Sequence, residues 1–137
     1  MININGGCHC GEIEFDAIVD ENKVILCHCI DCQKLSGTAF RSVVISEPNG
    51  FTLTKGVIKE YVKVAESGNQ RAQGFCQNCG SALYATSVDK LNRVYGIRAG
   101  SVEQRNELRP KFQIWCRSSV PWIKEIADLP TFDTIPL

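Results

Sequence analysis

The sequence lacks an excess of charge of either sign, a long apolar run and a leader-like beginning. Fifteen lysine and arginine residues balance fifteen aspartate and glutamate residues, so the broad positive charge of a nucleic-acid-binding protein is absent. No uncharged apolar stretch approaches the roughly 18 residues that span a bilayer. Residues 1–5 have neither the basic head nor the apolar stretch of a signal peptide. We therefore expect a cytoplasmic protein with no nucleic-acid partner and no membrane partner.

The chain also lacks a linker, a low-complexity tract, a glycine-rich phosphate loop and an internal repeat beyond pairs of cysteines. Its 137 residues can bury one hydrophobic core but not two independent ones. We interpret residues 1–137 as a single domain. The tail over residues 129–137 contains too much proline for a helix. We expect its apolar residues to pack as an extended strap, with a loose tail as the alternative.

Short strand-like segments dominate the pattern of the chain. Ile13, Phe15, Ala17 and Val19 alternate with acidic residues, with the period of two that a half-buried strand requires. Turn signals separate further β-branched and aromatic runs at residues 23–26, 39–45, 51–54, 57–64, 70–75, 82–86, 93–98 and 112–116. Helical signals are brief, at residues 101–104 and 121–127. The pattern predicts a mainly β fold, a sandwich or partly open barrel with few short helices.

Cysteine is the residue type whose placement is most informative. Eight of the 137 residues are cysteines, a smaller share than the roughly 8–10% of small disulfide scaffolds. Seven of them form three tight groups, and Cys116 stands alone. In a reducing cytosol, clustered cysteines bind metal more often than they form disulfides. We therefore interpret the three groups as metal ligands.

Two of the three groups complement each other. Cys76 and Cys79 form a Cys-x-x-Cys knuckle, which is half of a structural zinc site, and Gly80 permits the positive φ that such a turn often requires. Cys8 and Cys10 can supply the other half, because residues i and i+2 of an extended chain point to the same side. The four cysteines together predict a closed, tetrahedral and therefore structural zinc site. The alternative is two unrelated pairs of buried thiols.

Cys27, Cys29 and Cys32 form a group of a different kind, because no fourth cysteine lies near them in the sequence. Three protein ligands with an open position are the pattern of catalytic zinc. The residues after Cys32 can form a helical turn that ends near Gly37, which would favour the thiolate of Cys32. The alternative is that Cys116 supplies a fourth ligand and both sites are structural. Iron is disfavoured, because the spacing is not that of ferredoxins or Rieske centres.

His9 and His28 each lie between two of these cysteines. Strand geometry turns each imidazole away from the metal, so we predict neither to be a ligand. His28 is the better candidate for a proton shuttle, with packing as the alternative role. Seven thiolates and two Zn²⁺ ions would change the formal charge from 0 to −3, which again argues against a nucleic-acid partner.

Several stretches of the sequence resemble the glutathione-dependent formaldehyde-activating (GFA) family, which is also named for its centromere protein V relatives. The resemblance lies in residues 7–15, residues 27–34 with Gly37, and residues 75–80, and it extends to residues 109–115 and 121–122. All seven clustered cysteines are present in the order of the family. The resemblance implies short antiparallel β-sheets packed as a β-tent and held by a four-cysteine structural zinc.

The same resemblance implies the cofactors and the activity. It places one structural Zn²⁺ and one catalytic Zn²⁺ in each chain. We expect the catalytic ion to be the more labile of the two, because three ligands bind metal more weakly than four. The implied metal ligands are Cys8, Cys10, Cys76 and Cys79 for the structural ion, and Cys27, Cys29 and Cys32 for the catalytic ion. The implied activity is that of a carbon–sulfur lyase, similar to S-(hydroxymethyl)glutathione synthase, which acts on an adduct of a small thiol, such as glutathione, with a small aldehyde, such as formaldehyde.

Two alternatives to this lyase use the same residues. One is a zinc-stabilised binding module without turnover, and the other is a thiol redox switch in which the three-cysteine group releases zinc on oxidation. A lyase specific for glutathione would need cations near the zinc to meet two carboxylates. The candidates in the sequence are Lys34, Arg41, Arg98 and Arg117, with a solvated surface charge as the alternative role for each.

Overall fold

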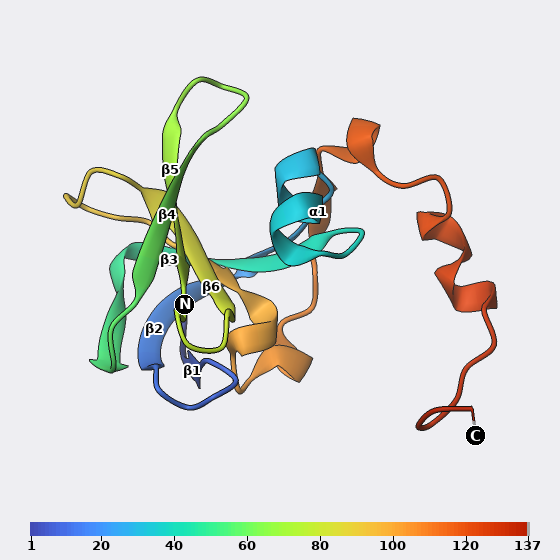
Figure 1. The fold of residues 1–137 in the computed structure, drawn as a ribbon, viewed down its shortest axis with the longest axis horizontal. Helices are drawn as coiled ribbons and strands as arrows, with labels where there is room; N and C mark the ends of the chain where they lie inside the picture. The colour runs from blue at the N-terminus through green and yellow to red at the C-terminus, as the bar shows by residue number, and fades with distance from the viewer. Residues whose placement is uncertain (137) are drawn as a thin grey trace.

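The computed structural model describes residues 1–136. Its strands form one sheet in the order β1-β2-β3-β7-β6-β5-β4, with β8 paired to β2 (Figure 1). Neighbours along this path are antiparallel, and β8 runs parallel to β2. The strands are β1 (Ile2–Gly7), β2 (Glu14–Cys27), β3 (Arg41–Lys55), β4 (Lys59–Val64), β5 (Gln70–Phe75), β6 (Ala82–Ser87), β7 (Gly96–Arg98) and β8 (Phe112–Ile114). The predicted mainly β, antiparallel fold is confirmed.

The helices are few and short, as the sequence predicts. The α-helix α1 (Ile30–Ser36) ends at Gly37, whose φ of 70° lies in the left-handed region and whose N–H donates to the carbonyl of Gln33. The 3₁₀-helices are η1 (Ala99–Ser101), η2 (Arg105–Glu107), η3 (Cys116–Ser118) and η4 (Ile123–Asp128). Within residues 1–136, every helix is too short or too polar to span a lipid bilayer.

β3 is longer than the sequence pattern predicts. The cluster of turn-forming residues at 47–50 indicated a break between two strands, but β3 continues through it. In the pairing of β2 with β3, Ile18 alone faces these four residues, so the extra length forms a bulge. A bulge tolerates Pro48, which has no N–H to give to the ladder. The prediction that a strand ends at these residues is therefore wrong, although they do form an irregularity within the strand.

One face of the sheet carries the hydrophobic core. The alternating residues of β2 lie in it, and Phe15 and Val19 are 1% and 0% exposed. Phe51 joins them through stacked rings, with centroids 4.9 Å from Phe15 and 4.8 Å from Tyr95. Other fully or nearly buried members are Ile4, Ile13, Ala17, Val24, Val44, Leu83, Ile97, Val102 and Leu108. Because side chains alternate along a strand, the opposite face is left for the polar residues described below.

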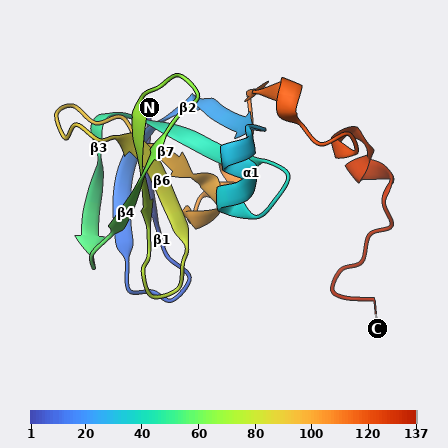
Figure 2. The ribbon, with the colours of Figure 1, turned by 45° about the horizontal axis from the view of Figure 1, so that its top comes forward.

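The C-terminal segment runs away from the domain, in orange and red at the right of both ribbon views (Figures 1 and 2). Its large apolar side chains are between 44% and 64% exposed, at Trp122, Ile126, Leu129, Phe132 and Ile135. The predicted strap is therefore wrong. Pro130 and Pro136 lack the backbone donors with which an added strand would pair with the sheet.

Removing residues 121–137 should leave the stability of the domain unchanged. Side chains that stay exposed contribute little free energy of burial, so we expect the melting temperature, measured by circular dichroism, to change by less than about 2 °C. A longer truncation after Lys111 also removes β8 and should lower it by several degrees. If the two truncations lower the melting temperature equally, residues 121–137 pack on the domain.

Candidate metal centres

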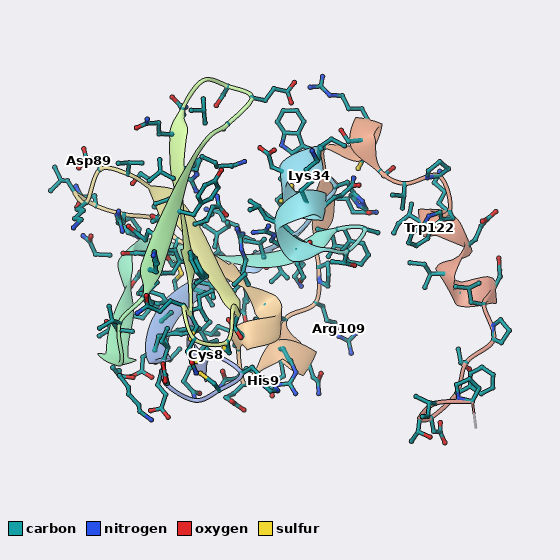
Figure 3. The ribbon with its side chains drawn as sticks, viewed as in Figure 1. Cys8, His9, Lys34, Asp89, Arg109 and Trp122 are labelled. Atoms are coloured by element: carbon teal, nitrogen blue, oxygen red, sulfur yellow. The ribbon has the colours of Figure 1, made fainter. Side chains whose placement is uncertain are left out.

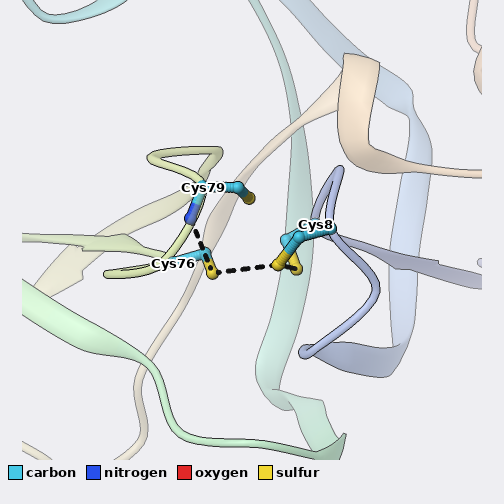
Figure 4. Close-up of side chains that lie close together, drawn as sticks. Cys8, Cys76 and Cys79 are labelled. Atoms are coloured by element: carbon cyan, nitrogen blue, oxygen red, sulfur yellow. Dashed lines mark hydrogen bonds between the residues drawn. The ribbon is translucent and has the colours of Figure 1, made fainter.

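Cys8, Cys10, Cys76 and Cys79 converge although more than sixty residues separate the two pairs. The Sγ atoms of Cys8 and Cys10 are 3.5 Å apart, those of Cys10 and Cys76 are 3.7 Å apart, and all four lie within 4.8 Å of one another. Figure 4 shows the sulfur atoms of the two loops turned towards each other. A tetrahedral zinc ion with Zn–S bonds of about 2.3 Å would hold its sulfurs about 3.8 Å apart. The group therefore fits such an ion.

The two loops of this group are built in the same way. In the β5–β6 turn, the N–H of Cys79 donates to the Sγ of Cys76, and Gly80 has a φ of 78°. In the loop after β1, the N–H of Ile13 donates to the Sγ of Cys8, and Gly11 has a φ of 83°. Each loop thus uses a left-handed glycine to turn the chain and a backbone donor to stabilise its first thiolate.

The pKa values of two thiols in the β5–β6 turn are shifted in opposite directions. Hydrogen bonds from the hydroxyl and backbone N–H of Ser81 lower the pKa of Cys79 to about 5. For Cys76, the backbone N–H of Cys79 favours the thiolate, but burial and the neighbouring sulfurs outweigh it and raise the pKa to about 11. Four thiolates in this space would repel one another, and a divalent cation would relieve that repulsion.

Cys27, Cys29 and Cys32 also converge, with all three Sγ atoms within 4.8 Å of one another. Cys27 ends β2, Cys29 is the N-cap of α1, and Cys32 lies in the first turn of that helix, as predicted. The N–H of Cys32 donates to the Sγ of Cys29 over 3.2 Å. Sequence spacing alone thus brings together three ligands that can hold one metal ion.

The pKa values of Cys27 and Cys32 are shifted in opposite directions. A hydrogen bond from the Cys32 thiol lowers the pKa of Cys27, and for the same reason, together with burial, the pKa of Cys32 is raised. One thiol stays protonated so that its neighbour can be charged. Because a bound metal would take the place of that proton, the donor set fits a cation as the first group does.

The remaining candidates from the sequence do not join either group. Cys116 is exposed and belongs to neither cluster in the described part of the chain. His9 is exposed, while His28 is 1% exposed, donates or accepts through Nε2 at 2.7 Å from Gln113, and lies 5.6 Å from the ring of Phe40. The geometry favours the packing role for His28 over a proton shuttle.

Glutamine side chains, which the sequence analysis missed, hold the three-cysteine group in place. Nε2 of Gln33 donates to the carbonyls of His28 and Ser118, both over 2.9 Å, and so ties α1 to the chain after β8. Gln113 on β8 makes the contact with His28. Both residues lie in stretches that carry the family resemblance, but their role was not predicted, because a glutamine becomes structural only through partners that the fold brings near.

The four candidate cations separate into two pairs. Lys34 lies on the exposed side of α1 (Figure 3), and Arg117 is 67% exposed and pairs with Glu66. The surface role is thus confirmed for these two. Arg41 and Arg98 are instead only 5% and 9% exposed. Burial, followed by the charge of Arg41, lowers the pKa of Arg98 to about 9.

The fold and these two groups define a mainly β protein with two separate cysteine clusters, each of which could hold a metal ion. The chain belongs to the family described as glutathione-dependent formaldehyde-activating enzyme, whose family model matches residues 3–118. It is 29% identical over 92 residues to an uncharacterized lyase of Schizosaccharomyces pombe, and the match covers 67% of the chain and 64% of that relative. The chain thus spans less than two thirds of the relative's length.

The fold also has a counterpart among solved structures. A crystal structure of a Rhodobacter sphaeroides protein superposes with a TM-score of 0.60 at 16% sequence identity. The superposition covers 80% of this chain and 98% of that protein. The similarity is one of fold.

Replacing Cys76 with serine should destabilise the protein strongly, because a closed site would lose one of four ligands and its binding free energy supports folding. We expect the melting temperature of zinc-loaded protein to fall by more than about 10 °C. Cys116→Ser, which alters an exposed thiol outside both groups, is the matched control and should stay within about 2 °C of the unsubstituted protein. Similar melting temperatures for both variants would show that the four sulfurs hold no structural metal.

Proposed function

We propose that the chain is a single-domain, zinc-dependent carbon–sulfur lyase that acts on an adduct of a thiol and a small aldehyde, of the S-(hydroxymethyl)glutathione type. The family match over residues 3–118 and the lyase similar to this chain support the activity. We further propose a β-tent packing for the sheet. Eight free cysteines are consistent with the reducing cytoplasm that we propose as its location.

The proposal assigns different roles to two zinc ions. Cys8, Cys10, Cys76 and Cys79 supply four ligands, which close the shell of a structural ion. Cys27, Cys29 and Cys32 supply three, which leaves one position for a reactant. The difference in ligand number between the groups, four sulfurs against three, is the observation that carries the proposal.

A pocket beside the three-cysteine group offers room for a reactant. It has a volume of about 350 Å³ and is lined by Cys29, Ile30 and Trp115, among others. Its rim carries the ion pair between Lys63 and Asp31, with Nζ and Oδ2 2.7 Å apart. Cys29 therefore lines a space that a small adduct can enter.

The chemistry needs no oxidant or reductant. In the lyase direction, the carbon–sulfur bond of the adduct breaks, its hydroxyl loses a proton as the carbonyl forms, and the sulfur leaves with the electron pair and takes up a proton. When bound, zinc would supply a Lewis acid that stabilises the departing thiolate. The three cysteines would hold the ion, while Gln33 holds α1, which carries Cys32.

Replacing Cys29 with serine should abolish lyase turnover and leave the fold intact, because this ligand belongs to the open group and not to the closed one. We expect turnover of the glutathione–formaldehyde adduct, followed by exchange NMR, to fall at least about 100-fold. Cys116→Ser should retain full turnover. If Cys29→Ser turns over normally, the three-cysteine site is not catalytic, and a binding module becomes the better interpretation.

The two zinc ions should differ in how readily a chelator removes them, because three ligands bind less tightly than four. Native mass spectrometry of chelator-free protein should show two zinc ions per chain, one of which a mild chelator removes together with turnover. Zinc released instead by mild peroxide, with no turnover at any occupancy, would favour the redox switch. If the chelator removes both zinc ions equally slowly, the result would argue against an open site.

A further inference from the structure

Two arginines lie buried behind the three-cysteine group and share one neutral acceptor. Nη2 of Arg98 donates to Oε1 of Gln73 over 2.7 Å, and Nη1 of Arg41 donates to the same oxygen over 3.4 Å. Nη2 of Arg41 also donates to the carbonyl of Cys32 over 3.5 Å. Both hydrogen bonds of Arg41 are long, so this guanidinium is held near the metal site without being well satisfied.

The sheet register places these residues on one face with a metal ligand. Cys27 on β2 pairs with Arg41 on β3, and two residues further along β3, Val43 pairs with Arg98 on β7. Side chains at paired positions, and at positions two apart, point to the same face. On β5, Gln73 follows the half-buried Arg71 by two residues. The polar face thus carries the metal ligand Cys27 next to three arginines, Arg41, Arg71 and Arg98.

These cations lack a carboxylate partner. The ion pairs among residues 1–136 include none with Arg41, Arg71 or Arg98. The Nε atoms of Arg41 and Arg98 are buried without a hydrogen-bond acceptor. A buried charge without a counter-ion is destabilising, and a buried polar atom without a hydrogen-bond partner calls for an explanation. An anion that the chain does not itself provide would offset it.

Arg41 also reaches a second pocket. This pocket has a volume of about 410 Å³ and is lined by Arg41 and Gln73 together with Leu35 of α1, Tyr61 and Phe75. Apolar walls with one buried cation are the features of a site for a small organic anion. Leu35 belongs to the same helix as Cys32, so a ligand in this pocket lies close to the cysteine group.

The charge balance of the zinc-loaded site favours an incoming anion. Three thiolates and one Zn²⁺ have a formal charge of −1, and Arg41 and Arg98 change the sum to +1. A bound carboxylate would neutralise this charge. Guanidinium and carboxylate are also matched in geometry, because the planar fork can donate two parallel hydrogen bonds.

We propose that Arg41, positioned by Gln73, which Arg98 holds in turn, binds a carboxylate of the thiol substrate in the pocket between α1 and β5. The thiol end of that substrate then reaches the open position of the three-cysteine site. This inference rests on the proposed function, since it names the residue that binds a carboxylate of the substrate at the same site. Gln73 accepts from both guanidinium groups, and neither Gln73 nor Arg98 touches the reacting atoms.

Binding to zinc-loaded protein, measured by calorimetry, tests the carboxylate contact apart from turnover. The probes are S-methylglutathione, which has carboxylates but no free thiol, and its diethyl ester, which has neither. We expect Arg41→Met to weaken binding of S-methylglutathione roughly 10- to 100-fold, because a charge-assisted hydrogen-bond pair is lost. The ester should bind both proteins equally weakly. The matched control is Arg109→Met, at an exposed arginine far from α1 (Figure 3), which should stay within about twofold.

Thermal unfolding of Arg41→Met separates a binding role from a structural one. Because Arg41 and Arg98 repel each other, removing one charge should leave the melting temperature unchanged or higher, whereas a structural role would lower it. If Arg41→Met does not fold, Arg41→Lys replaces the planar fork with a point charge and should weaken binding by about threefold or more. Unchanged binding in the folded variant would overturn the proposal.

Other outcomes identify a different source of the anion or a failure of the lyase. If the diethyl ester binds as tightly as S-methylglutathione, or if inorganic phosphate binds with the same dependence on Arg41 while S-methylglutathione does not, the carboxylate assignment is overturned. If S-methylglutathione binds through Arg41 but no thiol–aldehyde adduct is turned over, the carboxylate site stands and the proposed lyase function fails.

Discussion

The mutual repulsion of closely spaced thiolates is the constraint on which this structure depends. Seven sulfur atoms are held in two groups, each with its sulfurs within 4.8 Å of one another, and each group keeps some thiols protonated when no cation is near. Backbone donors, left-handed glycines and sheet pairing bring the sulfurs together against this repulsion. The free energy of metal binding is therefore coupled to the folding of the loops that carry the ligands.

The two groups differ in what the fold does with their ligands. The four-cysteine group joins the loop after β1 to the β5–β6 turn and fastens segments that are remote in sequence. The three-cysteine group lies at the junction of β2 and α1, beside a pocket. The buried Arg41 and Arg98 lie on the same face of the sheet as Cys27. Closed ligation stabilises, whereas open ligation next to solvent-accessible space suits exchange with a reactant. In the proposed function, the same sulfur ligands would therefore serve two roles, set by the number of ligands and by their surroundings.

The buried arginines indicate where this small domain gives up stability. Arg41 and Arg98 could each be replaced by apolar residues of similar volume with no loss of a carboxylate partner among residues 1–136, and such replacements of buried charges are often neutral or stabilising. Their presence beside a metal-competent site follows the general pattern in which strained or unsatisfied groups cluster where ligands bind. The exposed C-terminal segment lies outside this arrangement and beyond the matched family region, which ends at Ser118.

The sequence by itself determined the features that depend on short spacings. Cys27, Cys29 and Cys32 converge because a strand end runs directly into a helical turn, and the knuckle at Cys76 and Cys79 closes because Gly80 follows it. The period of two along β2 likewise predicted a core-facing strand correctly. Local backbone geometry is sufficient for each of these. The need of zinc for four ligands then predicted that the pair Cys8 and Cys10 complements the knuckle, and the family resemblance agreed.

The tertiary structure decided the rest. Only the register of β2, β3 and β7 places Arg41 and Arg98 on the face of Cys27, and only packing shows that these two are buried while Lys34 and Arg117 are exposed. The bulge at residues 47–50 and the exposed tail likewise contradicted local patterns. Burial and long-range pairing depend on the sum of contacts over the whole sheet, and no window of neighbouring residues contains that sum.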